Sequence, residues 1–205
     1  MKVYNEVVSP MGQDHFQERG FNNEEKHRLA NGALSDASGR RRGDGRRQTQ
    51  LAGGAGHVGI MGHDRIMISL VTAHYTNRGI RTNGALSVNV VEESWLEKAD
   101  AAGCASGAKV DKSGWFDYTV GETGAPLLDA ARVTMECVLE DTYETSGFDN
   151  FIITIKNTFA DESVLDERGR VDYRVLKPVL FEMPTYEYLR TGDVIGRCMK
   201  MNKKA

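Results

Sequence analysis

The residues with the clearest chemical potential lie in a short polar turn between Cys104 and Lys112. The turn contains the hydroxyl of Ser106, several backbone N–H groups and the ammonium groups of Lys109 and Lys112. Hydroxyl, N–H and ammonium groups are the donors that hold phosphates and other anions in proteins. We therefore interpret this turn as an anion site. The alternative is a polar loop that does no more than end the preceding helix.

A strand and a helix are predicted to position this turn. In residues 84–90, small or polar residues alternate with apolar ones, which is the period of a strand with one face in a core. Ser94 and Glu97 have the spacing of a capping box, which predicts a helix that starts at Trp95. The helix is expected to end near Gly103, since glycine tolerates the left-handed conformation that terminates helices.

The order of these features resembles one protein family. A strand ending in VN, then a helix, then the pattern C-x-S-G-x-x-x-D-K is similar to the flavin reductase family of FMN-binding split-barrel proteins. That family carries a related Cys, Ser-Gly and Asp-Lys segment after the same strand. The resemblance implies that Cys104, Ser106, Gly107, Asp111 and Lys112 bind FMN, with Ser106 and Lys112 at its phosphate.

A second stretch carries the same resemblance. An apolar run of strand length is followed by His74, Tyr75 and Thr76. The family has an R-P-S-R/H-Y-T segment here, whose basic and hydroxyl groups help to hold the FMN phosphate. The resemblance therefore assigns these three residues to the cofactor, with Thr76 at the phosphate. Val71 and Ala73 replace the family's arginine and serine, and the loss of a charged fork weakens phosphate capture. An ordinary strand end is the alternative.

The rest of the chain predicts a mainly β protein with short helices and a single domain overall. Residues 133–139 and 151–155 have the patterns of strands, and neither βαβ alternation nor a G-x-G-x-x-G motif is present. The resemblance implies an FMN-binding split β-barrel of Greek-key type over residues 57–205, including a C-terminal tail. Residues 1–56 are interpreted as an N-terminal region with a flexible loop, because arginines and glycines dominate 35–56.

Two stretches depart from the family pattern so abruptly that we consider a coding-frame shift for them. These are residues 35–56 and residues 77–83, and family-like sequence resumes directly after each. The hypothesis is tested by sequencing the encoding DNA. An intact frame, with the arginine-glycine run shared by close relatives, would contradict it.

Composition narrows the partners and the location. The net charge is −3 and the arginine-rich stretch lacks interleaved aromatic residues, so nucleic-acid binding is disfavoured. The chain has three cysteines, widely separated and odd in number, which indicates neither a disulfide framework nor a metal site. No run is long enough to span a bilayer, and no membrane partner is expected. A soluble cytoplasmic protein is the expectation.

The resemblance implies a flavoprotein oxidoreductase that transfers electrons from NAD(P)H to flavin. Because the isoalloxazine ring does the electron chemistry, no catalytic side chain is predicted. The alternatives are a non-enzymatic, flavoredoxin-like FMN-binding electron carrier and a degenerate family member without flavin. The resemblance also implies a homodimer with FMN near the interface. Tyr186, Tyr188 and Leu189 are expected to offer an apolar surface to the neighbouring subunit.

Overall fold

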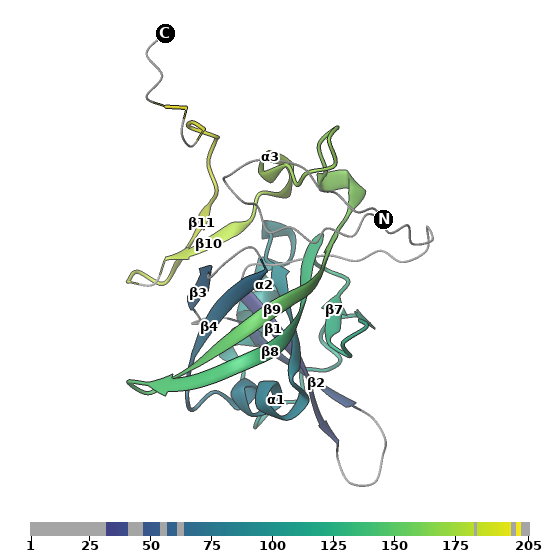
Figure 1. Ribbon diagram of the computed structural model, residues 1–205, viewed down its shortest axis with the longest axis vertical. Coiled ribbons are helices and arrows are strands. Elements are labelled where there is room, and N and C mark those ends of the chain that lie inside the picture. The colour runs from purple at the N-terminus through teal and green to yellow at the C-terminus, as the bar shows by residue number, and fades with distance from the viewer. Residues whose placement is uncertain are drawn as a thin grey trace.

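In the described part of the chain, a curled antiparallel sheet of seven strands forms the framework of the protein (Figure 1). The computed structural model describes residues 32–40, 47–53, 57–60, 64–182, 184–197 and 200–201. The strand order in the sheet is β2-β1-β5-β8-β9-β4-β3, so the central strands come from well-separated parts of the sequence. The strands are β1 (Gly32–Arg40), β2 (Arg47–Gly53), β3 (His57–Ile60), β4 (Arg65–Val71), β5 (Ala85–Val90), β8 (Val133–Thr145) and β9 (Phe148–Ala160).

Two small hairpins and several short helices surround the sheet in the described part of the chain. None of these helices has both the length and the apolar character that crossing a bilayer requires. The expectation of a mainly β protein with short helices is confirmed. The remaining elements are α1 (Tyr75–Asn83), η1 (Glu93–Trp95), α2 (Leu96–Cys104), β6 (Tyr118–Val120), β7 (Pro126–Leu128), η2 (Glu162–Val164), α3 (Tyr173–Leu176), β10 (Val179–Glu182) and β11 (Glu187–Arg190).

The two longest strands, β8 and β9, form a hairpin that runs across the molecule (Figure 1). A two-residue turn joins them, and both of its residues have positive φ: Ser146 at 49° and Gly147 at 83°. A turn of this kind matches the right-handed twist of the flanking strands. The pairing shifts register at Glu136/Cys137 and again at Leu139/Asp141, and such bulges bend a strand pair. The hairpin therefore curves around the core.

Among the residues whose burial the structure describes, the core consists of two apolar clusters. In the first, Ile80 from α1 packs against fully buried residues of β4, β5, β8 and β9, including Phe151. The second cluster surrounds Trp95 at the end of η1 and joins it to α2, β7 and α3; Phe116 meets the Trp95 ring edge-to-face at 5.8 Å. Because α1 belongs to one cluster and α2 to the other, burial fixes both helices against the sheet.

Strand β5 differs from the prediction of one buried face, because both of its faces are buried. The polar side chains of its second face are covered by β7. Ser87 donates to the carbonyl oxygen of Pro126 at 2.5 Å, and Asn89 accepts from the N–H of Leu128 at 3.2 Å and from the hydroxyl of Thr134 at 3.1 Å. Buried polar groups are tolerated only when they are paired in this way.

The predicted strands near residues 66–71, 133–139 and 151–155 are confirmed as β4, β8 and β9. The predicted capping box is wrong. Ser94 lies inside η1, and α2 begins only at Leu96, with no side-chain hydrogen bond at its N-cap. The expected helix end near Gly103 is confirmed, because α2 ends at Cys104; its C-cap, Ala105, is extended, so the helix does not end in a left-handed residue.

The flexible loop expected over residues 35–56 is replaced in part by β1 and β2. β1 pairs with β5, so Gly32–Arg40 belongs to the same sheet as the strands after residue 57. Residues 41–46 and 54–56 lie outside the described residues. Backbone pairing across a sheet does not depend on apolar composition, which is why the arginine-glycine pattern concealed these strands.

The other segment with an unusual sequence, residues 77–83, suits its position as it stands. It forms most of α1, which ends at Gly84 in the left-handed conformation, with φ of 64° and its N–H donating to the carbonyl oxygen of Ile80. Asn77 and Ile80 are buried, and Arg81 reaches a carboxylate on β9. These contacts need no displaced reading of the gene, and the frame hypothesis remains a question for DNA sequencing.

Candidate functional site

The first predicted group, His74, Tyr75 and Thr76, lies at the N-terminus of α1. His74 is the N-cap, and its side chain makes no capping hydrogen bond. The first N–H groups of a helix have no partner within the helix and carry partial positive charge. Thr76 is 6% exposed and adds a hydroxyl to this end. The arrangement provides uncharged donors for an anion directly after β4.

A buried carboxylate holds this helix in place. Asp149, at the start of β9, accepts from Asn77 at 2.6 Å and from both terminal nitrogens of Arg81 at 2.8 Å. Asn77 also donates to the carbonyl oxygen of Val71, which ties α1 back to the end of β4. Hydrogen bonding to the Arg81 guanidinium is the main cause that holds the pKa of Asp149 below its ordinary value. The carboxylate therefore stays ionised and positions α1.

The second predicted group forms a hydrogen-bonded turn after α2. The carbonyl oxygen of Ser106 accepts from the N–H groups of Lys109 and Val110 at 2.9 and 3.0 Å. Its hydroxyl oxygen accepts from the N–H of Ala108 at 3.3 Å, which leaves the hydroxyl hydrogen free to donate elsewhere. Gly107, the next predicted site residue, lies within this turn.

Cys104 and Asp111 lie at the two ends of this turn and make local contacts. The thiol of Cys104 is exposed and lies 3.9 Å from a carboxylate oxygen of Asp100, one helical turn earlier. Asp111 accepts from the N–H of Ser113 at 3.0 Å, the pattern of an Asx turn. The Asp111 contact shapes the backbone next to Lys112, whereas the Cys104 contact stays within α2.

Lys112 does not face solvent as an anion-binding lysine would. Its side chain is 4% exposed, and its ammonium donates to the carbonyl oxygens of Ala102 and Ala105 at 2.7 and 2.8 Å. These carbonyls belong to the last turn of α2 and to its C-cap, where a cation is favoured by the helix dipole. Burial lowers the pKa of Lys112. The predicted phosphate contact therefore competes with a structural role, that of closing the C-terminus of α2.

The eight predicted residues thus form two local groups, one at the start of α1 and one after α2. Each group is tied together by its own hydrogen bonds, and strand β5 and η1 separate the groups along the chain. That the two groups meet around one ligand stays a prediction.

Two further buried carboxylates, Glu92 and Glu136, lie outside the predicted set. Glu92, 5% exposed, follows β5 and accepts from Arg132, including Nε at 2.8 Å. Glu136 on β8 is fully buried and accepts from the backbone and hydroxyl of Thr123 and from Asn157, at 2.6 to 2.9 Å. Their partners lie 13 to 40 positions away. A single sequence contains no signal that pairs charges at such distances.

The Glu136 carboxylate also leaves no room for a side chain at Gly121. A Cβ atom added to Gly121 would lie 2.2 Å from Oε1 of Glu136, which its hydrogen bonds hold in place. We expect Gly121→Ala to lower the free energy of unfolding by about 2 kcal/mol, as measured by urea unfolding. Gly114→Ala is the matched control, because nothing lies within 4 Å of its added Cβ. Equal stability of the two variants would contradict this account.

Comparison with known proteins places this geometry in a family. The model of the flavin reductase like domain matches residues 56–188. No curated protein matches the chain significantly.

Solved structures of similar fold agree with this family. A flavoredoxin from Methanosarcina acetivorans is 27% identical with a TM-score of 0.71, over 92% of this chain and 98% of that chain. An FMN-binding protein from Thermus thermophilus is 18% identical with a TM-score of 0.63, over 88% and 96%. A flavin reductase-type protein with a split barrel domain from Shewanella frigidimarina is 16% identical with a TM-score of 0.66, over 84% of each chain. The split-barrel prediction is confirmed, and the chain belongs to the flavin reductase like domain family.

Proposed function

We propose that this protein binds FMN and transfers electrons to it from NAD(P)H. The observation that carries the proposal is the family match over residues 56–188. Two similar proteins, the flavoredoxin and the FMN-binding protein of Thermus thermophilus, support a flavin as the ligand. When bound, FMN would supply the electron-accepting ring, and the protein would supply binding and orientation.

The donor set suits a phosphate ester held mainly by uncharged groups. The uncapped N-terminus of α1 and the hydroxyl of Thr76 would hold the phosphate from one side. The hydroxyl of Ser106 retains a hydrogen that it can donate. Lys112 would add long-range positive charge, since two of its donors already bind α2 carbonyls. The residue positions are our proposal, and the Asp149–Arg81 pair would keep α1 oriented.

An absorption spectrum of the purified protein tests the function directly. We expect a yellow protein, or one that becomes yellow with added FMN, whose absorbance bleaches under anaerobic NADH or NADPH. A yellow protein inert to nicotinamides would instead support an electron carrier, which the likeness to a flavoredoxin favours. A protein that takes up no FMN would support a degenerate family member without flavin. Two observations favour this alternative: Lys112 is bound to the carbonyls of α2, and Val71 and Ala73 replace the family's arginine and serine.

Thr76 offers a sharper test of the phosphate site. We expect Thr76→Val to weaken FMN binding about tenfold, because one hydrogen bond to a charged group is removed while the shape is kept. The matched control is Thr82→Val on the same helix, whose hydroxyl donates to the carbonyl oxygen of Arg78. FMN titration monitored by tryptophan fluorescence gives both affinities. If Thr76→Val bound FMN as tightly as the wild type, the FMN phosphate would not be held by Thr76 at the N-terminus of α1.

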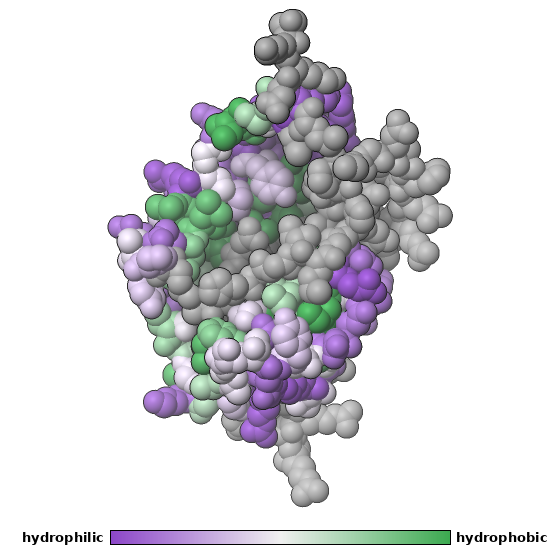
Figure 2. All heavy atoms as spheres, turned by 60° about the vertical axis from the view of Figure 1, so that its left-hand side comes forward, coloured by the Kyte–Doolittle hydropathy of each residue, from purple (hydrophilic) through white to green (hydrophobic). Residues whose placement is uncertain are grey.

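We also propose a homodimer in a reducing cytoplasm. Hairpin β10–β11 exposes Leu180, Phe181, Tyr188 and Leu189, and patches of hydrophobic side chains are visible on one face of the molecule (Figure 2). Exposed apolar surface of this kind supports a protein interface. Cys104 and Cys137 are free thiols, which supports a reducing compartment. Sedimentation analysis measures the oligomeric state.

A further inference from the structure

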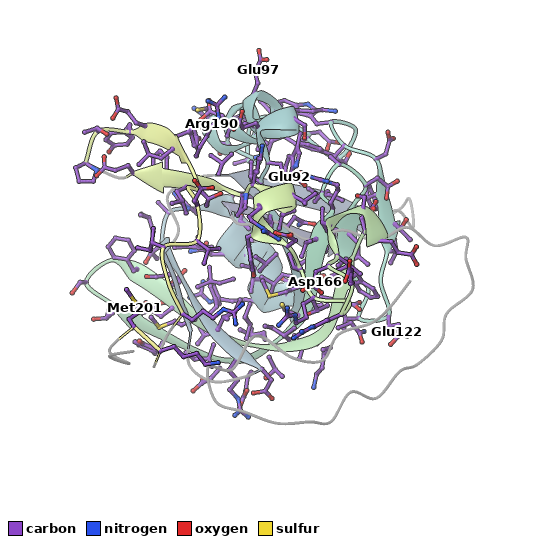
Figure 3. All side chains as sticks on the ribbon, turned by 90° about the horizontal axis from the view of Figure 1, so that it is seen from above. Glu92, Glu97, Glu122, Asp166, Arg190 and Met201 are labelled. Carbon is purple, nitrogen blue, oxygen red and sulfur yellow. The ribbon has the colours of Figure 1, made fainter. Side chains whose placement is uncertain are left out.

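A pocket of about 710 Å³ lies between η1, α3 and the end of β11. We call it the η1–α3 pocket. None of the eight residues predicted to bind FMN is among the described residues that line it. Its volume lies within the range of small-molecule sites. Seen from above, Glu92 lies beside α3, and Arg190 lies on the neighbouring hairpin (Figure 3). The polar lining of the pocket includes Glu92, Ser94, Arg132, Lys177, Arg190 and Thr191.

An ion pair between Glu92 and Arg132 forms the base of this pocket. Glu92 accepts from Nε of Arg132 at 2.8 Å and also from a terminal nitrogen of the same guanidinium. That nitrogen donates as well to the carbonyl oxygen of Val175 on α3, at 3.2 Å. The Arg132 side chain is therefore fixed from two sides. The buried carboxylate adds no net negative charge to the pocket, because its charge is matched.

The rim of the pocket contains a second ion pair and one cation that forms no ion pair with a carboxylate of the described residues. Arg190 on β11 donates to Glu93 at 2.8 Å, and this bond is the main cause that lowers the pKa of Glu93. Lys177 is exposed, and among the described residues no carboxylate forms an ion pair with it. With two pairs cancelled, Lys177 leaves the described lining with one net positive charge.

The backbone of Lys177 is held in an uncommon conformation. Its φ and ψ are 48° and 61°, in the left-handed region that residues other than glycine rarely adopt. The N–H of Lys177 caps α3 by donating to the carbonyl oxygen of Tyr173 at 2.9 Å. The next residue, Pro178, forms a bridge with Glu92. The Lys177 backbone is thus fixed at the pocket wall by contacts on both sides.

We propose that the η1–α3 pocket binds a small organic anion that carries a phosphate or carboxylate group. Lys177 supplies the charge, and the hydroxyls of Ser94 and Thr191 supply uncharged donors. Val175 and Leu176 give an apolar wall, and the volume far exceeds that of an inorganic ion. The ligand therefore has an apolar body beside its anionic group. This site is separate from the predicted flavin contacts and does not depend on the proposed function.

Calorimetric titration of the full chain with phenyl phosphate, benzoate and inorganic phosphate tests the proposal. We expect phenyl phosphate or benzoate to bind more tightly than inorganic phosphate, and the better of the two identifies the anionic group. Binding is expected to weaken as salt is raised, because an ion pair with exposed Lys177 is screened. Saturating FMN should leave this binding unchanged.

Two variants locate the binding. We expect Lys177→Gln to weaken it about tenfold, and Lys156→Gln, an exposed lysine on β9 that does not line the pocket, to leave it unchanged. The melting temperature of each variant reports whether it is folded. Absence of binding by both organic anions, displacement by FMN, or equal affinity of the two variants would each overturn the proposal.

Discussion

Arg132→Met is expected to lower the free energy of unfolding by about 3 kcal/mol. The substitution keeps most of the side-chain volume and removes the charge that neutralises Glu92. The carboxylate of Glu92 is 7% exposed, so water cannot replace the lost guanidinium. A buried charge without its partner is far more costly than the intact pair is stabilising. Urea unfolding at pH 7 measures the difference.

Two further variants separate this effect from the loss of any surface arginine. Arg174→Met is the matched control, because Arg174 pairs with Asp172 with its side chain 70% exposed, and it should change stability by less than about 1 kcal/mol. The double variant Glu92→Gln with Arg132→Met should recover part of the loss, since no unpaired charge remains. If the two arginine variants were equally stable, the Glu92–Arg132 pair would not support the fold as we describe.

Asp149→Asn is expected to cost a similar amount, about 3 kcal/mol, at pH 7. Asp149 is fully buried and accepts charge-assisted bonds from Arg81 together with a bond from Asn77. An amide has the same shape but loses the charge and turns an N–H group toward donors. The matched control is Asp141→Asn, an exposed aspartate on β8 whose carboxylate accepts from the adjacent Thr142 N–H. Similar losses in both variants would contradict the role assigned to Asp149.

The lowered pKa of Asp149 predicts how the free energy of unfolding depends on pH. Because the pKa of Asp149 is lower in the folded protein than its ordinary value of 3.8, folding favours the ionised form. Its contribution is complete above about pH 4 and disappears as the pH falls below 3.8 toward the lowered value. We therefore expect the stability gap between wild type and Asp149→Asn to narrow in that window. A gap that stayed constant down to pH 2 would show that the carboxylate charge is not its source.

Local patterns in the sequence predicted the parts of the fold whose information is local. The apolar run before His74 and the β-branched run near residues 151–155 are strands because a repeating pattern of side chains marks a buried face over a few residues. The Cys104–Lys112 motif identified the family for the same reason, since its residues are neighbours. Within residues 35–56, where a flexible loop is expected, the described parts belong to β1 and β2, because β1 pairs with β5 and β2 pairs with β1.

Only the tertiary structure decided which partner each long or charged side chain takes. Lys112 bends back to the carbonyls of α2, although the motif suggested an outward ammonium. Glu92 and Arg132 meet across 40 positions and form the base of a pocket that no motif marks. Long side chains have many rotamers and oppositely charged candidates are numerous, so composition and spacing leave the choice open. Packing resolves it, because a buried charge or carbonyl must find whichever partner the fold brings within reach.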